Sequence, residues 1–194
     1  MRARSLPLSI ITAMRLGAIF AALAAPLLLA DVRQCACDPA KPETMRAREC
    51  SLCNEAAKHT GTGEIFFLKD SNPRKANRWL ALPRVHLAAG HPIHQLPAVL
   101  QTKLWTEAIA KAKELWGAEG WGIAYNGDVH RTQCHAHVHI GKLLSGLAPG
   151  KYYETSSPAG IRLRADGSGL WIHSVNGKLR VHYGEGITET VLLR

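Results

Sequence analysis

The sequence predicts an α+β fold: an antiparallel sheet with one helix packed on it, followed by a small C-terminal β-meander. Three observations lead to this prediction. Apolar residues recur at spacings of three and four over 97–116, which is typical of an amphipathic helix. The segments on either side contain short apolar runs bounded by turn residues, as strands do. Asn176-Gly177 lies between two such runs and is typical of a type I′ hairpin turn.

The expected elements follow one another in an order that suits this fold. Two strands precede the helix, and Pro73 and Pro83 mark their ends. Pro97 suits the first turn of the helix, and Gly117 ends it. We expect strands at 64–70, 78–83, 121–126 and 135–143, and beyond Gly146 at 160–165, 169–175, 178–183 and 187–193.

The first thirty residues differ from the rest of the chain. Met1–Ala30 holds three arginines and no acidic residue, and 15 uncharged, mostly apolar residues follow Arg15. This pattern predicts a signal peptide or a membrane anchor, and so a protein that is exported to the periplasm or cell exterior or anchored by its N-terminus. The apolar run is shorter than the ~20 residues that span a bilayer, and both alternatives stay open. We divide the remainder into a Cys-containing linker (31–49), a central domain (50–146) that holds the predicted helix and the strands around it, and a β-rich extension (147–194).

Composition and charge narrow the classes of partner. The chain is 46% apolar and 20% charged, as folded globular proteins are. Because 1–30 holds three arginines and no acid, the rest carries +6 of the formal net charge of +9. A basic surface suits an anionic substrate or an anionic membrane face. No Lys/Arg-rich run with interleaved aromatic residues is present, and we therefore expect no nucleic-acid partner.

The strongest chemical signal is three histidines on alternate positions, His135, His137 and His139. In a strand all three imidazoles would lie on one face, with Ala136 and Val138 on the other. Neighbouring imidazoles suppress one another's protonation, so at least one should be neutral near pH 7. A neutral imidazole can attack phosphorus or bind a metal. The alternative is a polar or metal-binding surface strand.

This stretch resembles the signature of the histidine-triad superfamily, in which three histidines alternate with apolar residues. Trp79–Pro83 followed by His86, and Tyr125-Asn126-Gly127, resemble two further segments of that superfamily, and the resemblance covers about 50–144. Lys142 departs from the apolar end of the signature. The resemblance implies a histidine-triad-like sheet and a hydrolase that cleaves a nucleotide phosphoanhydride. It implies His137 as the nucleophile, with His135 and His139 orienting it or donating to phosphate oxygens. A homodimer is compatible with it.

Two other functions stay open beside the hydrolase. One is a nucleotidyltransferase of the same superfamily, and the other is a non-catalytic zinc- or nucleotide-binding module. Within the superfamily, the run Arg131-Thr132-Gln133 resembles a membrane-associated branch, the CDP-diacylglycerol pyrophosphatases. That resemblance implies a lipid-nucleotide substrate and membrane association, whereas a soluble nucleotide remains the alternative.

Four polar residues near the triad are candidates for substrate binding. Arg131 could make a charge-assisted contact with phosphate, while Asn126, Thr132 and Gln133 could form neutral hydrogen bonds. The alternative for these residues is the stabilisation of a loop or turn.

Five cysteines allow two competing structures. Cys50 and Cys53 have the spacing of a zinc half-site, and superfamily members that bind zinc use ligands at positions matching these two, His86 and His135. A structural Zn²⁺ bound by these four residues is therefore expected. In an oxidising compartment disulfides compete, with pairings such as Cys37–Cys50 or Cys35–Cys53. Two further expectations are that Cys134 is an ordinary residue at a strand edge and that His173 and His182 form a surface pair.

Overall fold

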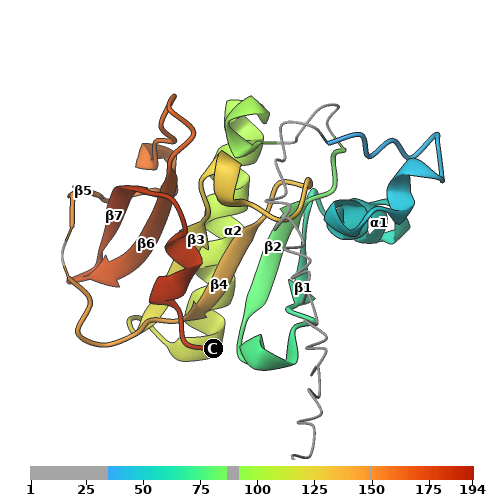
Figure 1. Ribbon diagram of the computed structural model, residues 1–194. Helices are drawn as coiled ribbons and strands as arrows, with labels where there is room; N and C mark the ends of the chain where they lie inside the picture. Colours follow the sequence, from blue (N-terminus) through green and yellow to red (C-terminus); the bar gives the residue numbers. More distant parts are fainter. Residues whose placement is uncertain (1–34, 87–91, 149) are drawn as a thin grey trace, which may run out of the picture.

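The computed structural model describes residues 35–86, 92–148 and 150–194, and their strands form one seven-stranded antiparallel sheet (Figure 1). The strand order is β1-β2-β4-β3-β6-β7-β5, and each neighbouring pair is antiparallel. The strands are β1 (Ile65–Lys69), β2 (Trp79–Pro83), β3 (Trp121–Tyr125), β4 (Val138–Lys142), β5 (Tyr152–Thr155), β6 (Gly169–Val175) and β7 (Lys178–Glu185). The α-helices are α1 (Ser51–Lys58) and α2 (Ala98–Trp116). The predicted α+β fold, with a helix packed on an antiparallel sheet, is confirmed.

The predicted N-terminal signal or anchor lies outside the described residues. Among the residues that are described, no helix is both long enough and apolar enough to cross a membrane.

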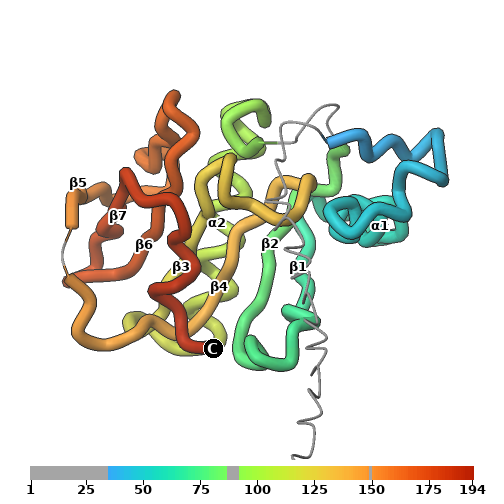
Figure 2. The backbone as a smooth tube through the Cα atoms, in the orientation of Figure 1, coloured from blue at the N-terminus to red at the C-terminus, as the bar shows by residue number. Residues whose placement is uncertain are grey.

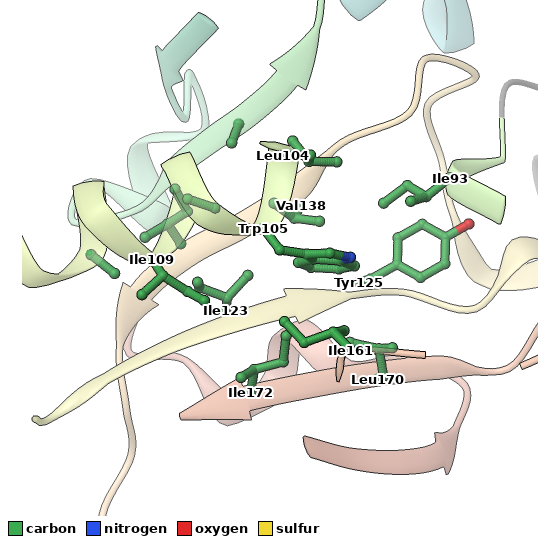
Figure 3. Close-up of a cluster of buried hydrophobic side chains, with 14 of the residues drawn as sticks. Ile93, Leu104, Trp105, Ile109, Ile123, Tyr125, Val138, Ile161, Leu170 and Ile172 are labelled. Carbon is green, nitrogen blue, oxygen red and sulfur yellow. The ribbon is translucent and has the colours of Figure 1, made fainter. Parts of the chain in front are cut away.

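The main core lies between α2 and one face of the sheet (Figure 3). Trp105 and Ala108 on α2 are buried against Ile123 of β3 and Ile140 of β4. Because α2 presents an apolar face along its length, it covers the central strands. The opposite face carries His139 and two smaller apolar clusters, one with α1 and one with the C-terminal segment. Removing a buried aromatic such as Trp105 typically costs about 3–5 kcal/mol, so this packing holds the strands that carry the histidines.

Strand β4 begins later than the sequence predicted. The predicted strand 135–143 is a strand only over Val138–Lys142, and His135 and His137 come before it in extended and bent backbone. Two contacts with a segment distant in sequence accompany this late start. The Cys134 N–H donates to Glu49 O at 2.8 Å, and Cys134 forms a disulfide with Cys35. These two ties hold the chain before Val138 against the N-terminal segment, and its backbone does not join the ladders with β2 and β3.

The C-terminal strands extend the same sheet, because β6 pairs with β3. The expected turn between β6 and β7 is present, with positive φ at both Asn176 (50°) and Gly177 (76°). Two strand predictions are wrong and one strand was missed. Segment 160–165 has no partner strand and packs Ile161 and Leu163 against the core, and 187–193 contains the 3-10 helix η8 (Thr188–Val191). The missed strand is β5.

Helix η8 lies across β3 and β6 on the sheet face opposite α2, as the backbone tube in Figure 2 shows. The Asn126 side-chain oxygen Oδ1 accepts hydrogen bonds from the N–H groups of Thr188 and Glu189 at 2.9 and 3.0 Å. These bonds satisfy N–H groups at the start of the helix, much as an N-cap does. They explain why a segment whose apolar residues alternate does not continue the sheet.

His173 and His182, which we expected to form a surface pair, do lie together, but one of them is buried. His182 is 2% exposed and stacks on Trp171, with ring centroids 3.6 Å apart. His173 is half-buried, and its Nε2 lies 3.1 Å from Nε2 of His182. The indole of Trp171 covers His182, so the prediction that both residues lie on the surface is wrong for His182.

Candidate functional site

A cavity of about 470 Å³ is lined by two of the three triad histidines, His137 and His139. It lies on the sheet face opposite α2, and its wall includes Leu80 of β2, His139 of β4 and Asn126, which follows the end of β3. The remaining lining comes from the loop after β1, the start of α1, the loop before β4 and η8. The polar residues lining it are Ser51, Glu55, Lys69, Asp70, Ser71, Asn72, Lys75, Asn126, His130, Thr132, Gln133, His137, His139 and Glu189.

His137 is held in the tautomer that a nucleophile needs. Its Nδ1 lies 2.7 Å from the backbone oxygen of His135. A carbonyl can only accept, so Nδ1 carries the proton and a neutral ring keeps its lone pair on Nε2. Burial, followed by the neighbouring His139, holds the pKa of His137 well below its ordinary value of 6.5. At neutral pH His137 is therefore a neutral imidazole with an available lone pair.

His139 lies beside His137 and belongs to the same cavity. The two ring centroids are 5.0 Å apart and the rings are nearly perpendicular. Burial lowers the pKa of His139 to about 4, although the Glu189 carboxylate acts in the opposite direction. Its Nδ1 lies 3.6 Å from Oε2 of Glu189.

His135 is separated from this pair and belongs to a second cluster. Its Nε2 lies 2.7 Å from the backbone oxygen of Pro83, and its ring centroid is 6.0 Å from that of His86. Of the three histidines, His135 does not line the cavity that His137 and His139 share. The structure therefore does not gather all three imidazoles around one cavity.

The metal prediction is supported in part. Cys50 forms a disulfide with Cys37, so it cannot offer a thiolate, and its assignment as a zinc ligand is wrong. Cys53, His86 and His135 do converge, because each offers a ligand atom within 4.8 Å of the others. Pro83 O fixes the proton of His135 on Nε2, which leaves Nδ1 as the nitrogen able to bind a metal. One thiolate and two imidazoles are ligands of the types that Zn²⁺ prefers, and three of them leave the fourth tetrahedral position for water.

Burial raises the pKa of the Cys53 thiol to about 12. A metal ion would have to displace that proton, because the thiolate is the form that binds a metal.

The disulfides also correct two other cysteine predictions. The pairing Cys37–Cys50 is present, but Cys35 pairs with Cys134 and not with Cys53. Cys134 is thus a cross-linked residue beside the triad, not an ordinary strand-edge position.

Three of the four candidate substrate-binding residues line the cavity, and two of these three also form hydrogen bonds that stabilise the surrounding loops. Thr132 is exposed at the cavity wall. Gln133 also lines the cavity, but its Oε1 accepts from Ser51 Oγ at 2.7 Å and its Nε2 donates to Arg48 O at 3.1 Å, which ties the loop to the start of α1. Since Asn126 Oδ1 supports η8, only its amide hydrogens are left to serve a ligand.

Arg131 does not reach the histidine cavity. It is 2% exposed, its guanidinium lies 3.4 Å from Asp128 Oδ1, and it lines a neighbouring cavity of about 630 Å³. Its charge is enclosed there, between Asp128 and the ring of Tyr125. The expected contact of Arg131 with a phosphate in the histidine cavity is therefore not supported. The cations that do line that cavity are Lys69 and Lys75.

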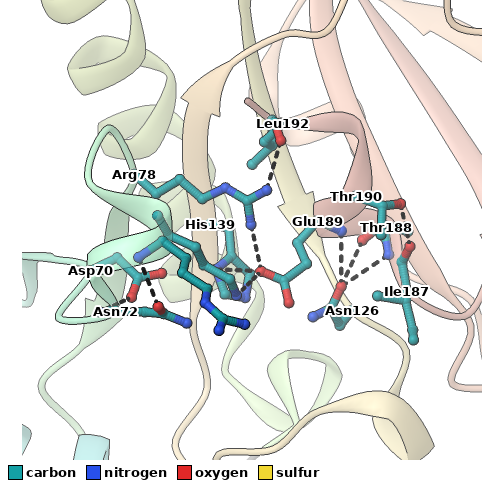
Figure 4. A network of polar contacts seen from close by, with 12 residues as sticks. Asp70, Asn72, Arg78, Asn126, His139, Ile187, Thr188, Glu189, Thr190 and Leu192 are labelled. Carbon is teal, nitrogen blue, oxygen red and sulfur yellow. Dashed lines mark hydrogen bonds and ion pairs between the residues drawn. The ribbon is translucent and has the colours of Figure 1, made fainter. Parts of the chain in front are cut away.

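Sequence reasoning missed Lys75 and Glu189. Glu189 Oε2 lies 2.6 Å from Lys75 Nζ and 2.7 Å from Arg78 Nη1 (Figure 4). Through these ion pairs the C-terminal segment contacts the residues around the cavity. No motif marks either residue, and the apparent alternation over 187–193 predicted a strand there. The sequence pointed to this region only through Asn126-Gly127, because the side chain of Asn126 accepts a hydrogen bond from the backbone N–H of Glu189.

No protein-family model matches the chain, and no curated protein is significantly similar to it. The chemistry of the site must therefore be inferred from its geometry and from the sequence motifs.

Proposed function

We propose that the protein is an exported hydrolase of a nucleotide phosphoanhydride and that it acts through a nucleotidyl-His137 intermediate. The observation that carries this proposal is the state of His137: a neutral imidazole, protonated on Nδ1, in a cavity that also contains lysines. The resemblance to the histidine-triad superfamily points to the same residue.

The reaction has two displacement steps. His137 Nε2 attacks the α-phosphorus, an N–P bond forms, and the P–O bond to the second phosphate group breaks. Water then attacks the same phosphorus, the N–P bond breaks, and the nucleoside monophosphate leaves. In this proposal Lys69 and Lys75, which line the cavity, supply positive charge for the phosphate oxygens. We assign the proton donation to the leaving group to His139, because its ring lies beside that of His137.

The substrate class is a nucleotide joined to a second phosphate-bearing group. Arg131-Thr132-Gln133 favours a CDP-diacylglycerol-like lipid, but the enclosed position of Arg131 removes the contact that this run suggested. A soluble nucleotide pyrophosphate fits the same cavity chemistry. Two disulfides among the described cysteines support export to an oxidising compartment.

We further propose a structural zinc ion on Cys53, His86 and His135. It would cross-link α1, the segment after β2 and the loop before β4. A purely metal-binding function for the triad is less well supported, because His137 and His139 line the cavity, whereas His135 groups with Cys53 and His86.

The test uses the full-length protein and a panel of nucleotide pyrophosphates that includes CDP-diacylglycerol in detergent. Mass spectrometry in ¹⁸O-labelled water should detect one labelled oxygen in the nucleoside monophosphate. Transfer to another acceptor instead of water would indicate the nucleotidyltransferase.

His137→Gln should abolish turnover and the acid-labile nucleotidyl adduct. His59→Gln, a change of the same type outside the cavity, should leave both intact. Wild-type turnover by His137→Gln would eliminate the covalent mechanism.

A further inference from the structure

A carboxylate from the C-terminal segment reaches the histidine cavity. Glu189 lies on η8, and its Oε2 contacts Lys75 Nζ at 2.6 Å and Arg78 Nη1 at 2.7 Å. The same oxygen lies 3.6 Å from Nδ1 of His139. Glu189 thus links two cations and one imidazole through a single atom (Figure 4).

The position of Glu189 is fixed from both sides. On one side, Asn126 Oδ1 accepts the N–H groups of Thr188 and Glu189. On the other, Arg78 donates to the backbone oxygens of Leu192 and Leu193 at 2.6 and 3.0 Å. Because the backbone is held before and after the side chain, the carboxylate can move only by rotation about its own bonds.

The charges around Glu189 keep it ionised. Burial alone would raise its pKa, but His139, Lys75 and Arg78 outweigh burial and lower it to about 2. The charged groups that face His139 are Glu189, Lys75, Arg78 and Asp70, and the ring of His137 lies beside it. Of the two carboxylates, Glu189 exerts the larger effect on His139.

His139 Nδ1 is a buried nitrogen without a hydrogen-bond partner among the described residues. The Glu189 oxygen at 3.6 Å is too far for a hydrogen bond, yet a side-chain rotation of a few tenths of an ångström would close the gap. Catalytic hydrogen bonds are often long in the absence of substrate and shorten in its presence. A buried polar atom without a hydrogen bond costs free energy, and the movement would remove that cost.

We propose that Glu189 is a positioning residue that accepts a hydrogen bond from His139 Nδ1 and supports the protonated form of His139. This inference rests on the proposed function for its catalytic consequence. With Nδ1 bound to Glu189, Nε2 is the nitrogen that exchanges a proton in the cavity. The arrangement resembles the carboxylate–imidazole pair of hydrolytic triads, in which the carboxylate orients the ring. Glu189 also balances Lys75 and Arg78, which would otherwise oppose a charge on His139.

The contact is tested directly by NMR of the full-length protein with ¹⁵N-labelled histidine at pH 7. In the wild type His139 should be protonated on Nδ1, with a downfield N–H proton typical of a bond to carboxylate. Glu189→Ala should lose this signal and shift the ring toward the Nε2–H tautomer, because Lys75 and Arg78 can only donate.

Glu189→Gln is the second variant, for use if Glu189→Ala does not fold. Its amide oxygen can still accept a hydrogen bond from Arg78. It should also lose the downfield proton. Glu185→Gln changes an acid on β7 outside this cavity and should retain it. An unchanged His139 signal in both Glu189 variants would overturn the proposal.

Kinetics separate positioning from a purely structural role. On a substrate that the wild type cleaves, Glu189→Gln should lower kcat at least tenfold and change KM less than threefold. If Glu189 served only as a counter-ion needed for folding, every variant that folds would have the wild-type kcat. That result would also overturn the proposal. If the wild type cleaves no nucleotide pyrophosphate, the proposed function fails, while the NMR signal still decides whether Glu189 binds His139.

Discussion

Removing the Cys35–Cys134 disulfide should lower the free energy of unfolding more than removing Cys37–Cys50. The first joins residues 99 apart in sequence, the second residues 13 apart. The entropy of closing such loops in the unfolded chain corresponds to about 4.7 kcal/mol for the long loop and about 3 kcal/mol for the short one. Each double Cys→Ala variant also loses some packing, since most of these cysteines are buried. From loop length alone, the free energies of unfolding of the two variants should differ by about 1.5–2 kcal/mol.

Urea unfolding followed by tryptophan fluorescence measures this difference, because the chain has five tryptophans. The Cys35→Ala/Cys134→Ala and Cys37→Ala/Cys50→Ala proteins are compared with the wild type, each with and without dithiothreitol. With the reductant, all three proteins lack disulfides and should differ only by packing. The reasoning is refuted if, without the reductant, the long-loop variant loses less than about 1 kcal/mol, or if the short-loop variant is the less stable one.

Three further predictions concern pH, charge and metal. In the folded protein the pKa of His139 is about 4 and that of His137 lies well below 6.5. The unfolded chain therefore binds more protons than the folded protein as the pH falls from 6.5 toward 4, and the free energy of unfolding decreases. Denaturation midpoints should fall with pH across that window and stay constant above it. Arg131→Ala breaks a buried ion pair and should lower the free energy of unfolding by about 3 kcal/mol, whereas an effect under 1 kcal/mol in urea titrations would show that the pair is dispensable. Purified protein should contain about one equivalent of zinc by elemental analysis, and Cys53→Ser should lose it; metal-free wild type with an unchanged thermal midpoint after chelation would exclude the site.

Local patterns predicted the helix and the strands next to it. Helix α2 was expected at 97–116 and lies at Ala98–Trp116, because its apolar spacing and terminal residues are short-range signals. The turn at Asn176-Gly177 was predictable for the same reason, since positive φ at both positions favours those residues.

Long-range choices were not predictable. Nothing near Cys134 indicates Cys35 as its partner, and that bond changes where β4 begins and where His135 points. Glu189 could not be assigned either, because its role depends on Asn126, Lys75 and Arg78 from distant segments. The histidine spacing identified the right strand, but only His137 and His139 share a cavity.

The order of elements along the chain also sets the order in which the cavity is assembled. Helix η8 follows all seven strands, so its carboxylate is synthesised after the imidazoles that it faces. A growing polypeptide acquires its triad while the cavity still lacks the wall formed by Thr188–Val191. A chain interrupted before η8 would carry the histidines without the carboxylate that we propose positions His139.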